Sequence, residues 1–161
     1  MKILLFSDSH GHTLNMIKAA KKYNDIDMII HLGDFLKDVL KLKEEIKKPA
    51  YEFVAGNNDW SMDYPSEKLI IAEKKRIFIT HGHLYSVKND YKRIISKGLA
   101  LNADAVFFGH THKTEEFFYE NMLILNPGSI SLPMDSDRPT YCVIEINEGK
   151  IISKFASPSS Y

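Results

Sequence analysis

The sequence predicts a single α/β domain, and three observations support this prediction. Through the first 100 residues, short apolar runs alternate with segments of helical spacing, as in a sheet covered by helices. After residue 105 the chain changes to short strands joined by polar turns, which indicates a second sheet nearby. The chain has 161 residues, 44% apolar and 26% charged, which suits one globular domain over residues 1–161 with a sizeable core.

The first half of the chain is expected to alternate strands with helices. Residues 3–6 are all apolar, which is typical of a strand buried on both faces. Thr13 can cap a helix that runs to about Tyr23, because its hydroxyl can accept hydrogen bonds from the first backbone N–H groups. Pro49 ends a second helix at about 35–47, since the residue before a proline avoids helical geometry. Two further apolar runs predict strands at 28–31 and 51–54.

The second half is expected to contain one more helix among several strands. Residues 68–72 and 76–80 predict consecutive strands, because a short polar turn separates them. Asn89 or Asp90 can open a helix, since the apolar side chains that follow recur at helical spacing as far as Leu99. The remaining strands are expected at 105–108, 117–119, 123–125, 141–146 and 150–155.

The balance of charge limits the classes of partner. The 21 basic and 21 acidic residues cancel, which argues against an extended surface for nucleic acid or an anionic membrane. Cys142 is the single cysteine, so no internal disulfide can form. Asp8 interrupts the first apolar run before a signal peptide is complete, and no run approaches the ~20 apolar residues of a membrane span. We therefore expect a cytoplasmic protein.

Five of the expected strands end in glycine, aspartate, asparagine or histidine. The apolar runs are followed by SDSH, GD, GNND, HGH and GHTH, and all seven histidines lie inside or next to these segments. In an open α/β sheet, the carboxyl ends of the strands converge on the ligand crevice, so the five segments are expected to meet in space. The simpler alternative for the first segment is that residues 7–9 only cap a helix.

Metal binding is the chemistry that these residue types favour. Aspartate, asparagine and histidine offer oxygen and nitrogen ligands that suit manganese, iron, zinc, nickel or cobalt. The candidates are too many for one structural ion and sufficient for two, with the Asp34 carboxylate as the natural bridge. Two ions about 3.5–4 Å apart can clamp the attacking and leaving oxygens of a phosphoryl displacement. The candidate ligands are Asp8, His10, Asp34, Asn57, His81, His110 and His112.

The ordered motifs D-x-H, G-D, G-N-x-D, H and G-H-x-H resemble those of the calcineurin-like metallophosphoesterases. In this chain they stand as Asp8-Ser9-His10, Gly33-Asp34, Gly56-Asn57-Asn58-Asp59, His81 and Gly109-His110-Thr111-His112. The short length, the His81-Gly82-His83 triplet and the Asn126-Pro127-Gly128-Ser129 segment are similar to the small bacterial and archaeal phosphodiesterase branch. A eukaryotic retromer subunit related to that branch shares its fold.

This resemblance implies a four-layer α/β/β/α sandwich of two mixed sheets flanked by helices. A metal-bound water or hydroxide would attack a small-molecule phosphodiester at a site with two divalent ions. Manganese or nickel are the expected ions, with iron, zinc or cobalt as alternatives. The implied ligands are Asp8, His10 and His112 for one ion, Asn57, His81 and His110 for the other, and Asp34 between them.

Asn58 stands where many family members have a histidine that contacts the phosphate. An amide can hydrogen-bond a phosphate oxygen but cannot supply a proton to the leaving group, so we expect a preference for activated esters. His12 and His83 each follow a candidate ligand by two residues, and they either contact the phosphate or are exposed loop histidines. His31 is expected to pack and hydrogen-bond locally, and Trp60 either lines the substrate site or packs ordinarily.

Two other functions are compatible with the same motifs. A scaffold or protein-interaction module of this fold would bind metal without catalysis, and a phosphomonoesterase would use the same ligands on a monoester. A pure scaffold has no need for the complete ligand set, because unpaired polar groups in a crevice are costly. The sequence therefore favours the phosphodiesterase.

Overall fold

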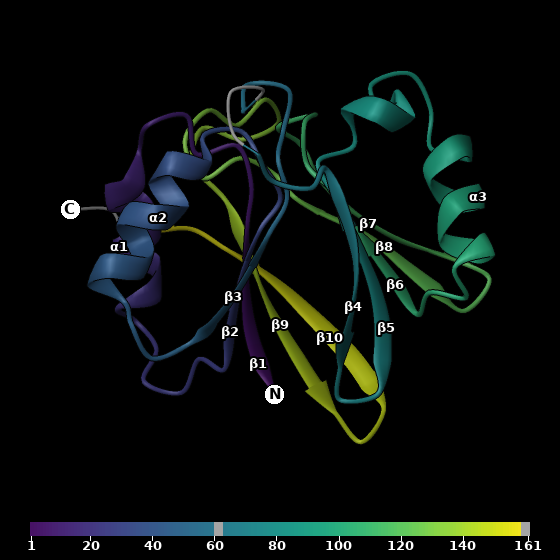
Figure 1. Cartoon of the computed structure of the whole chain (residues 1–161), viewed down its shortest axis with the longest axis horizontal. Coiled ribbons are helices and arrows are strands. Elements are labelled where there is room, and N and C mark those ends of the chain that lie inside the picture. Colours follow the sequence, from purple (N-terminus) through teal and green to yellow (C-terminus); the bar gives the residue numbers. More distant parts are fainter. Residues whose placement is uncertain (60–62, 159–161) are drawn as a thin grey trace.

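The structure, a computed structural model, describes residues 1–59 and 63–158 and arranges them in four layers. Two five-stranded sheets pack face to face (Figure 1). Helices α1 (Thr13–Ala20) and α2 (Leu36–Glu45) cover the outer face of the first sheet, and α3 (Lys92–Ala100) covers the outer face of the second. The predicted four-layer α/β/β/α sandwich is therefore confirmed.

The two sheets take their strands from different parts of the chain. The first has the order β10-β9-β1-β2-β3 and the second the order β4-β5-β6-β8-β7. The strands of the first sheet are β1 (Lys2–Phe6), β2 (Met28–His31), β3 (Ala50–Phe53), β9 (Tyr141–Asn147) and β10 (Lys150–Ala156). Those of the second are β4 (Glu67–Ala72), β5 (Lys75–Thr80), β6 (Ala105–Phe107), β7 (Thr114–Tyr119) and β8 (Met122–Pro127). A short 3-10 helix, η1 (His83–Tyr85), lies between β5 and α3.

Parallel pairing gathers the functional strand ends at one end of the molecule. Strand β1 runs parallel to β2 and β2 parallel to β3, while β6 runs parallel to both β5 and β8. Strands β4, β7, β9 and β10 add antiparallel pairs, so both sheets are mixed. In Figure 1 the carboxyl ends of β1, β2, β3, β5 and β6 lead into the loops at the top of the view.

The apolar run at 3–6 is buried on both faces, as predicted. Ile3 and Leu5 pack with side chains of β5, β6 and β8 in the core between the two sheets. Leu4 and Phe6 point the other way and pack with Met16 of α1. All four side chains of the run are fully buried, and each contributes about 1.5–3 kcal/mol of hydrophobic stabilisation. Strand β1 is thus fixed from both sides, which holds the segment after it in place.

The predicted elements are present, but several boundaries differ. Strand β7 begins at Thr114, β8 extends to Pro127, and α3 begins at Lys92 with Tyr91 at the N-cap position instead of Asn89 or Asp90.

The remaining difference concerns α1. This helix ends at Ala20 instead of Tyr23, whose backbone N–H bonds to the carbonyl three residues back in a tighter turn. Thr13 does not cap the helix, because its hydroxyl donates to Asp38 of α2 at 2.9 Å and joins the two helices instead. The N-cap position belongs to His12, which makes no side-chain cap hydrogen bond. The position of Asp38 in the fold, rather than the local sequence, therefore determines what the Thr13 hydroxyl contacts.

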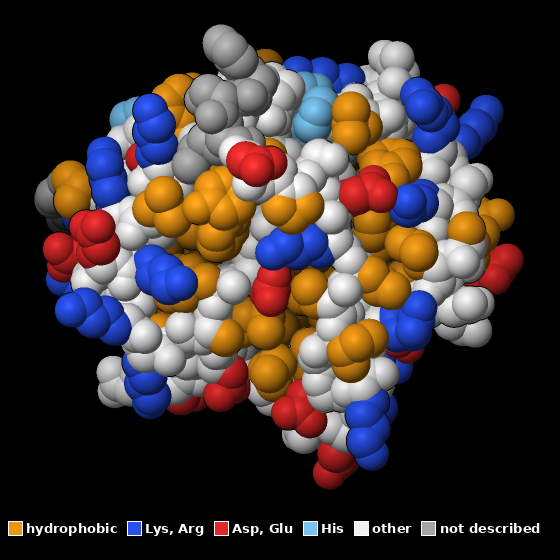
Figure 2. Space-filling view, viewed as in Figure 1, with side chains coloured by type: hydrophobic (Ala, Val, Ile, Leu, Met, Phe, Trp, Pro, Cys, Tyr) orange, Lys and Arg blue, Asp and Glu red, His pale blue; other side chains and the backbone are white. Residues whose placement is uncertain are grey.

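The surface is of mixed charge. Figure 2 shows basic and acidic side chains interspersed over one face, with histidine side chains at its upper rim, the end at which the loops after β1 and β2 lie. Among the described residues, no helix is both long enough and apolar enough to cross a membrane.

Candidate metal centre

The candidate ligands come together at the carboxyl ends of four strands. Asp8 follows β1, Asp34 follows β2, His81 follows β5 and His110 follows β6. The backbone N–H of His110 donates to Oδ2 of Asp8 at 3.0 Å, and this contact joins the loops of the two sheets. The predicted convergence of these four segments is present in the structure.

Asp8, His10 and His112 form one group whose ligand atoms all lie within 4.8 Å of one another. Nε2 of His112 lies 3.2 Å from Oδ1 of Asp8, and Nε2 of His10 lies 3.9 Å from the same oxygen. This Oδ1 is buried and has no hydrogen-bond partner among the described residues. A buried charged oxygen without a partner is costly, and a cation held by the three ligand atoms would supply the missing partner.

Asp8, Asp34 and His81 form a second such group. Nε2 of His81 lies 3.4 Å from Oδ1 of Asp34 and 3.2 Å from Nδ1 of His110. The other oxygen of Asp34, Oδ2, lies 3.7 Å from Nε2 of His10 in the first group. Asp34 therefore presents one oxygen to each group, which fits a bridging carboxylate. Oδ1 of Asp8 is equally central, because it lies 3.9 Å from Nε2 of both His10 and His81.

Backbone carbonyls orient two of the histidine rings. Nδ1 of His81 donates to the carbonyl of Leu32 at 2.8 Å, and Nδ1 of His112 donates to the carbonyl of Leu132 at 2.7 Å. With the proton held on Nδ1, the lone pair of Nε2 faces the carboxylates of the cluster. Metal-binding histidines are commonly oriented in this way.

The electrostatics of the cluster favour cation binding. Burial lowers the pKa of His10, and burial with the nearby charges of His81 and Lys88 lowers the pKa of His110 to about 4, so both rings are neutral at pH 7. The pKa of Asp8 is about 2, because interactions with His112 and His81 outweigh the burial that would raise it. Asp8 in turn raises the pKa of His112. A cation bound between Asp8 and His112 would compete with a proton for the same ligand atoms.

Glycines allow the motifs to approach one another closely. A Cβ atom on Gly109 would collide with the side chains of Ser7 and Asp8, and one on Gly56 would collide with the side chain and backbone of Asp34. Gly33 has a φ of +100° and packs against the backbone of Gly56. At Gly56 and Gly109 the close approach of a candidate ligand from another motif therefore leaves no room for a side chain.

The comparison with protein families decides the relationship. The model of the calcineurin-like phosphoesterase superfamily domain matches residues 1–149. This chain belongs to that superfamily. A cluster of aspartate and histidine ligands at strand ends is accordingly the centre of a phosphoesterase domain, and divalent metal ions are what this family of metallophosphoesterases implies for it.

Individual proteins of known name or structure are similar to this phosphoesterase over most of its length. Phosphodiesterase MJ0936 of Methanocaldococcus jannaschii is 34% identical over 146 residues, covering 80% of this chain and 83% of that protein. The crystal structure of a predicted phosphoesterase from Streptococcus pneumoniae has a TM-score of 0.85 at 27% identity, covering 98% of this chain and 89% of that one. Vps29 of Entamoeba histolytica, crystallised with Zn²⁺, has a TM-score of 0.74 at 20% identity, covering 99% and 100%, a likeness of fold alone. The expected family and its eukaryotic fold relative are confirmed.

Residues 126–131 of the phosphoesterase hold the ligand loops in position. The hydroxyls of Ser129 and Ser131 both donate to the backbone carbonyl of Asp8, at 2.8 and 2.9 Å. The side-chain amide of Asn126 donates to the carbonyl of Gly109 at 3.0 Å. Sequence reasoning used the N-P-G-S segment only as a family signature and missed this role, although the segment itself was the available signal.

The two asparagines after β3 differ in what they contact. Asn58 is exposed, and its backbone N–H and its side-chain amide donate to the two carboxylate oxygens of Asp34 at 3.0 and 2.7 Å. It thus contacts a candidate ligand directly. Asn57 is exposed in the same turn, and its assignment as a metal ligand stays a prediction.

The remaining histidines differ in their burial and in what they contact. His83 is half-buried, its ring lies 5.4 Å from that of His81, and its Nδ1 is buried without a hydrogen-bond partner among the described residues. His12 is exposed and lines a separate cavity between α1 and α2. His31 is buried and accepts the backbone N–H of Gly33 at 3.2 Å, which is a packing role. Trp60 lies outside the described residues.

Proposed function

We propose that this domain is a divalent-metal-dependent phosphodiesterase with a dinuclear site. The observation that carries the proposal is the pair of ligand groups that share Asp8 and have Asp34 between them. The likeness to Phosphodiesterase MJ0936 supports the class of substrate. The balanced charge and the single cysteine support a small-molecule diester as substrate and a cytoplasmic location.

The donor set fits divalent transition metals. Carboxylate oxygens and neutral imidazole nitrogens suit manganese or nickel, which we propose as the ions, and they also accept iron, zinc or cobalt. Asp8, His10 and His112 would hold one ion, while His81 and His110, with Asn57, would hold the other. When bound, such a pair supplies Lewis-acid polarisation of the phosphate and activation of water.

The side chains of the domain place the substrate and balance its charge. Asp34 keeps the two groups at a fixed separation, and the hydrogen bonds from Asn58 fix the plane of the Asp34 carboxylate. The ring of His83 lies beside that of His81, and its Nδ1 has no hydrogen-bond partner within the described part of the chain, so we propose that His83 donates to a phosphate oxygen. His12 is exposed, and a phosphate contact from it would require a substrate that reaches past the cluster.

The direct test is metal removal and return. The protein is stripped with a chelator, single divalent ions are added back, and bis(p-nitrophenyl) phosphate is assayed beside p-nitrophenyl phosphate. We expect diester hydrolysis that depends on metal and that falls at least about 100-fold in Asp8→Asn and His112→Gln, because each removes a ligand of the cluster. Glu148→Gln, in the exposed turn between β9 and β10, is the matched control.

Three results separate the alternatives. Hydrolysis that never depends on metal would overturn the proposal. Preference for the monoester would make the protein a phosphatase. Metal binding by calorimetry without hydrolysis of either ester would identify a scaffold.

A further inference from the structure

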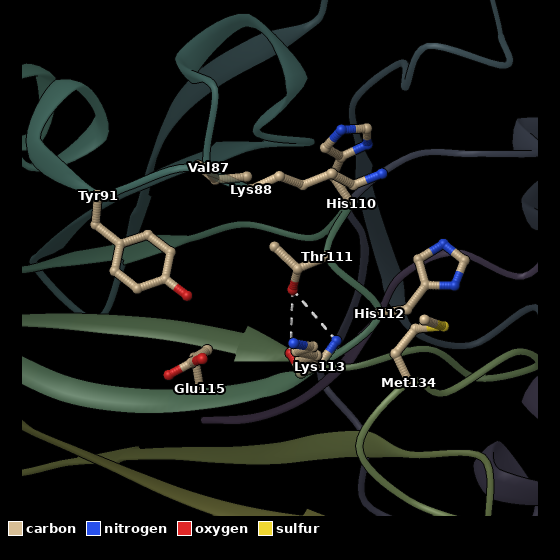
Figure 3. Close-up of a pocket in the computed structure, with 9 residues that line it drawn as sticks. All are labelled: Val87, Lys88, Tyr91, His110, Thr111, His112, Lys113, Glu115 and Met134. Atoms are coloured by element: carbon tan, nitrogen blue, oxygen red, sulfur yellow. Dashed lines mark hydrogen bonds between the residues drawn. The ribbon is translucent and has the colours of Figure 1, made fainter.

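A cavity of about 460 Å³ adjoins the candidate metal centre. Its lining consists of Val87, Lys88, Tyr91, residues 110–113, Glu115 and Met134 (Figure 3). His110 and His112 belong to both the cavity and the candidate metal centre. Pockets that bind small organic groups usually have volumes of about 300–1,000 Å³. A phosphate at the metal centre would therefore have room beside it for one of its organic groups.

Lys88 places a positive charge at the end of the cavity nearest the cluster. Its side chain extends toward His110 in Figure 3, and its charge is among the causes that lower the pKa of that ring. No carboxylate of the described residues lies within salt-bridge distance of the Lys88 ammonium. An unpaired cation beside histidines that hold metals gains most from an anion, and a phosphate oxygen would be that anion.

On the opposite side of the cavity, the Glu115 carboxylate is a hydrogen-bond acceptor that lies beside the packed ring of Tyr91. The ring of Tyr91 packs against Phe108 and Phe117, with centroids 5.4 and 5.5 Å apart, and its hydroxyl points toward Glu115 (Figure 3). Burial, with the nearby Glu115 carboxylate, raises the pKa of Tyr91 to about 12, and the oxygens of Glu115 are acceptors at this side of the cavity. These oxygens suit N–H or O–H donors on a ligand.

The third side of the cavity is apolar, and its backbone is hydrogen-bonded to a candidate metal ligand. The Met134 side chain is 70% exposed at the cavity, and the Met134 backbone N–H donates to the carbonyl of His112 at 2.9 Å. Val87 is buried and contributes to the same lining. An acyl chain would bury the Glu115 carboxylate without a partner, so the cavity suits a compact group with both a flat apolar face and polar donors.

We propose that this cavity, the substituent pocket, binds one organic group of the phosphodiester, and that it selects a polar group of nucleoside size that carries N–H or O–H donors. Lys88 contacts a non-bridging phosphate oxygen, and Glu115 accepts a hydrogen bond from the organic group. The inference rests on the proposed phosphodiesterase function. Both residues bind substrate, and neither takes part in bond making or breaking.

The test compares two substrates with the same leaving group, p-nitrophenyl thymidine 5′-phosphate and bis(p-nitrophenyl) phosphate, on the manganese-loaded protein. Lys88→Met should raise KM for both substrates roughly 10-fold with little change in kcat, and Lys88→Arg should restore most of the loss, because a charge-assisted hydrogen bond is removed and returned. Glu115→Gln should raise KM roughly 10-fold for the thymidine ester alone. Lys92→Met removes a nearby exposed lysine that does not line the cavity and should change neither KM.

Equilibrium binding of thymidine 5′-phosphate, followed by calorimetry, gives a readout independent of turnover. Weaker binding in Lys88→Met and Glu115→Gln with normal binding in Lys92→Met supports the pocket. Equal KM values and equal dissociation constants in all variants would overturn it, even if the wild-type protein is an active diesterase. A wild-type protein that hydrolyses no diester would refute the proposed function, and the calorimetry would still decide whether the pocket binds the nucleotide.

Discussion

Asp59 is the residue whose substitution most directly tests how the fold builds the site. Its buried carboxylate accepts three backbone hydrogen bonds: Oδ2 from Asp34 at 2.8 Å and from Gly56 at 3.0 Å, and Oδ1 from Leu36 at 2.8 Å. Leu36 is the first residue of α2, and the N-cap residue Phe35 offers no side-chain cap. One carboxylate therefore caps a helix and fixes the backbone of a candidate bridging ligand.

The substitution Asp59→Asn keeps the size of the side chain and replaces one of the two acceptor oxygens with an N–H donor. If the amide oxygen takes the place of Oδ2, two hydrogen bonds survive without their charge, and the amide N–H group faces the N–H of Leu36. The reverse orientation leaves two N–H groups unpaired. A buried N–H without a partner costs about 1–3 kcal/mol, and a hydrogen bond to a charged group is worth about 1.5–3 kcal/mol. We expect a loss of about 2–4 kcal/mol in the free energy of unfolding.

Urea unfolding of the metal-free protein measures this loss, and metal titration by calorimetry measures the weaker cation binding that a displaced Asp34 should cause. Asp63→Asn is the matched control, because it alters an exposed aspartate in the same loop. A free energy of unfolding for Asp59→Asn within about 0.5 kcal/mol of the wild-type value, the range typical of surface substitutions, would refute this account of the loop.

Three further predictions follow from single contacts. Gly109→Ala forces a Cβ into Ser7 and Asp8, so it should lower the free energy of unfolding by about 1–3 kcal/mol and weaken metal binding, as measured by thermal unfolding with and without manganese. Burial lowers the pKa of His31 from 6.5 to about 4, so the unfolded chain binds more protons than the folded one between these pH values. The free energy of unfolding should therefore fall by about 3 kcal/mol as the pH is lowered through this range. His31→Gln should flatten this part of the pH profile measured by urea unfolding. Asn58→His should raise turnover of diesters with poor leaving groups, and unchanged turnover on every substrate would contradict the role given to this position.

The sequence was sufficient to predict the convergence of the main ligands. Asp8, Asp34, His81 and His110 each follow a buried apolar strand directly, so the position of each is fixed by a strand end whose periodicity is plain. The pattern of apolar runs also predicted a sheet covered by helices with a second sheet nearby, and the family resemblance supplied the four-layer arrangement. Only family resemblance supplied the division of the ligands between two ions.

The sequence could not reveal the contacts that position those ligands. Asp59 and Asp38 accept hydrogen bonds from, and Ser131 donates one to, backbone groups 23 or more positions away along the chain, and no local spacing encodes such a pairing. Thr13 illustrates the reverse error, because its local pattern predicts a helix cap and its hydroxyl binds Asp38 instead. The direction in which a long side chain extends is hardest to predict from sequence, and the substituent pocket depends on the directions of Lys88 and Glu115.

The backbone of the candidate ligands is held in an unfavourable conformation by contacts with other parts of the protein. Five candidate ligands adopt positive φ angles, between 43° and 69°: Asp8, His10, Asp34, His110 and His112. Such angles cost on the order of 1 kcal/mol or more for residues other than glycine, and they persist only where surrounding contacts enforce them. Here those contacts come from protein groups, including the two serine hydroxyls on the carbonyl of Asp8 and the carboxylate of Asp59 on the N–H of Asp34. The candidate ligands lie outside the two largest apolar clusters, so burial of these clusters stabilises the fold independently of the ligands. The protein contacts therefore offset the cost of the positive φ angles and hold the candidate ligand side chains close to one another.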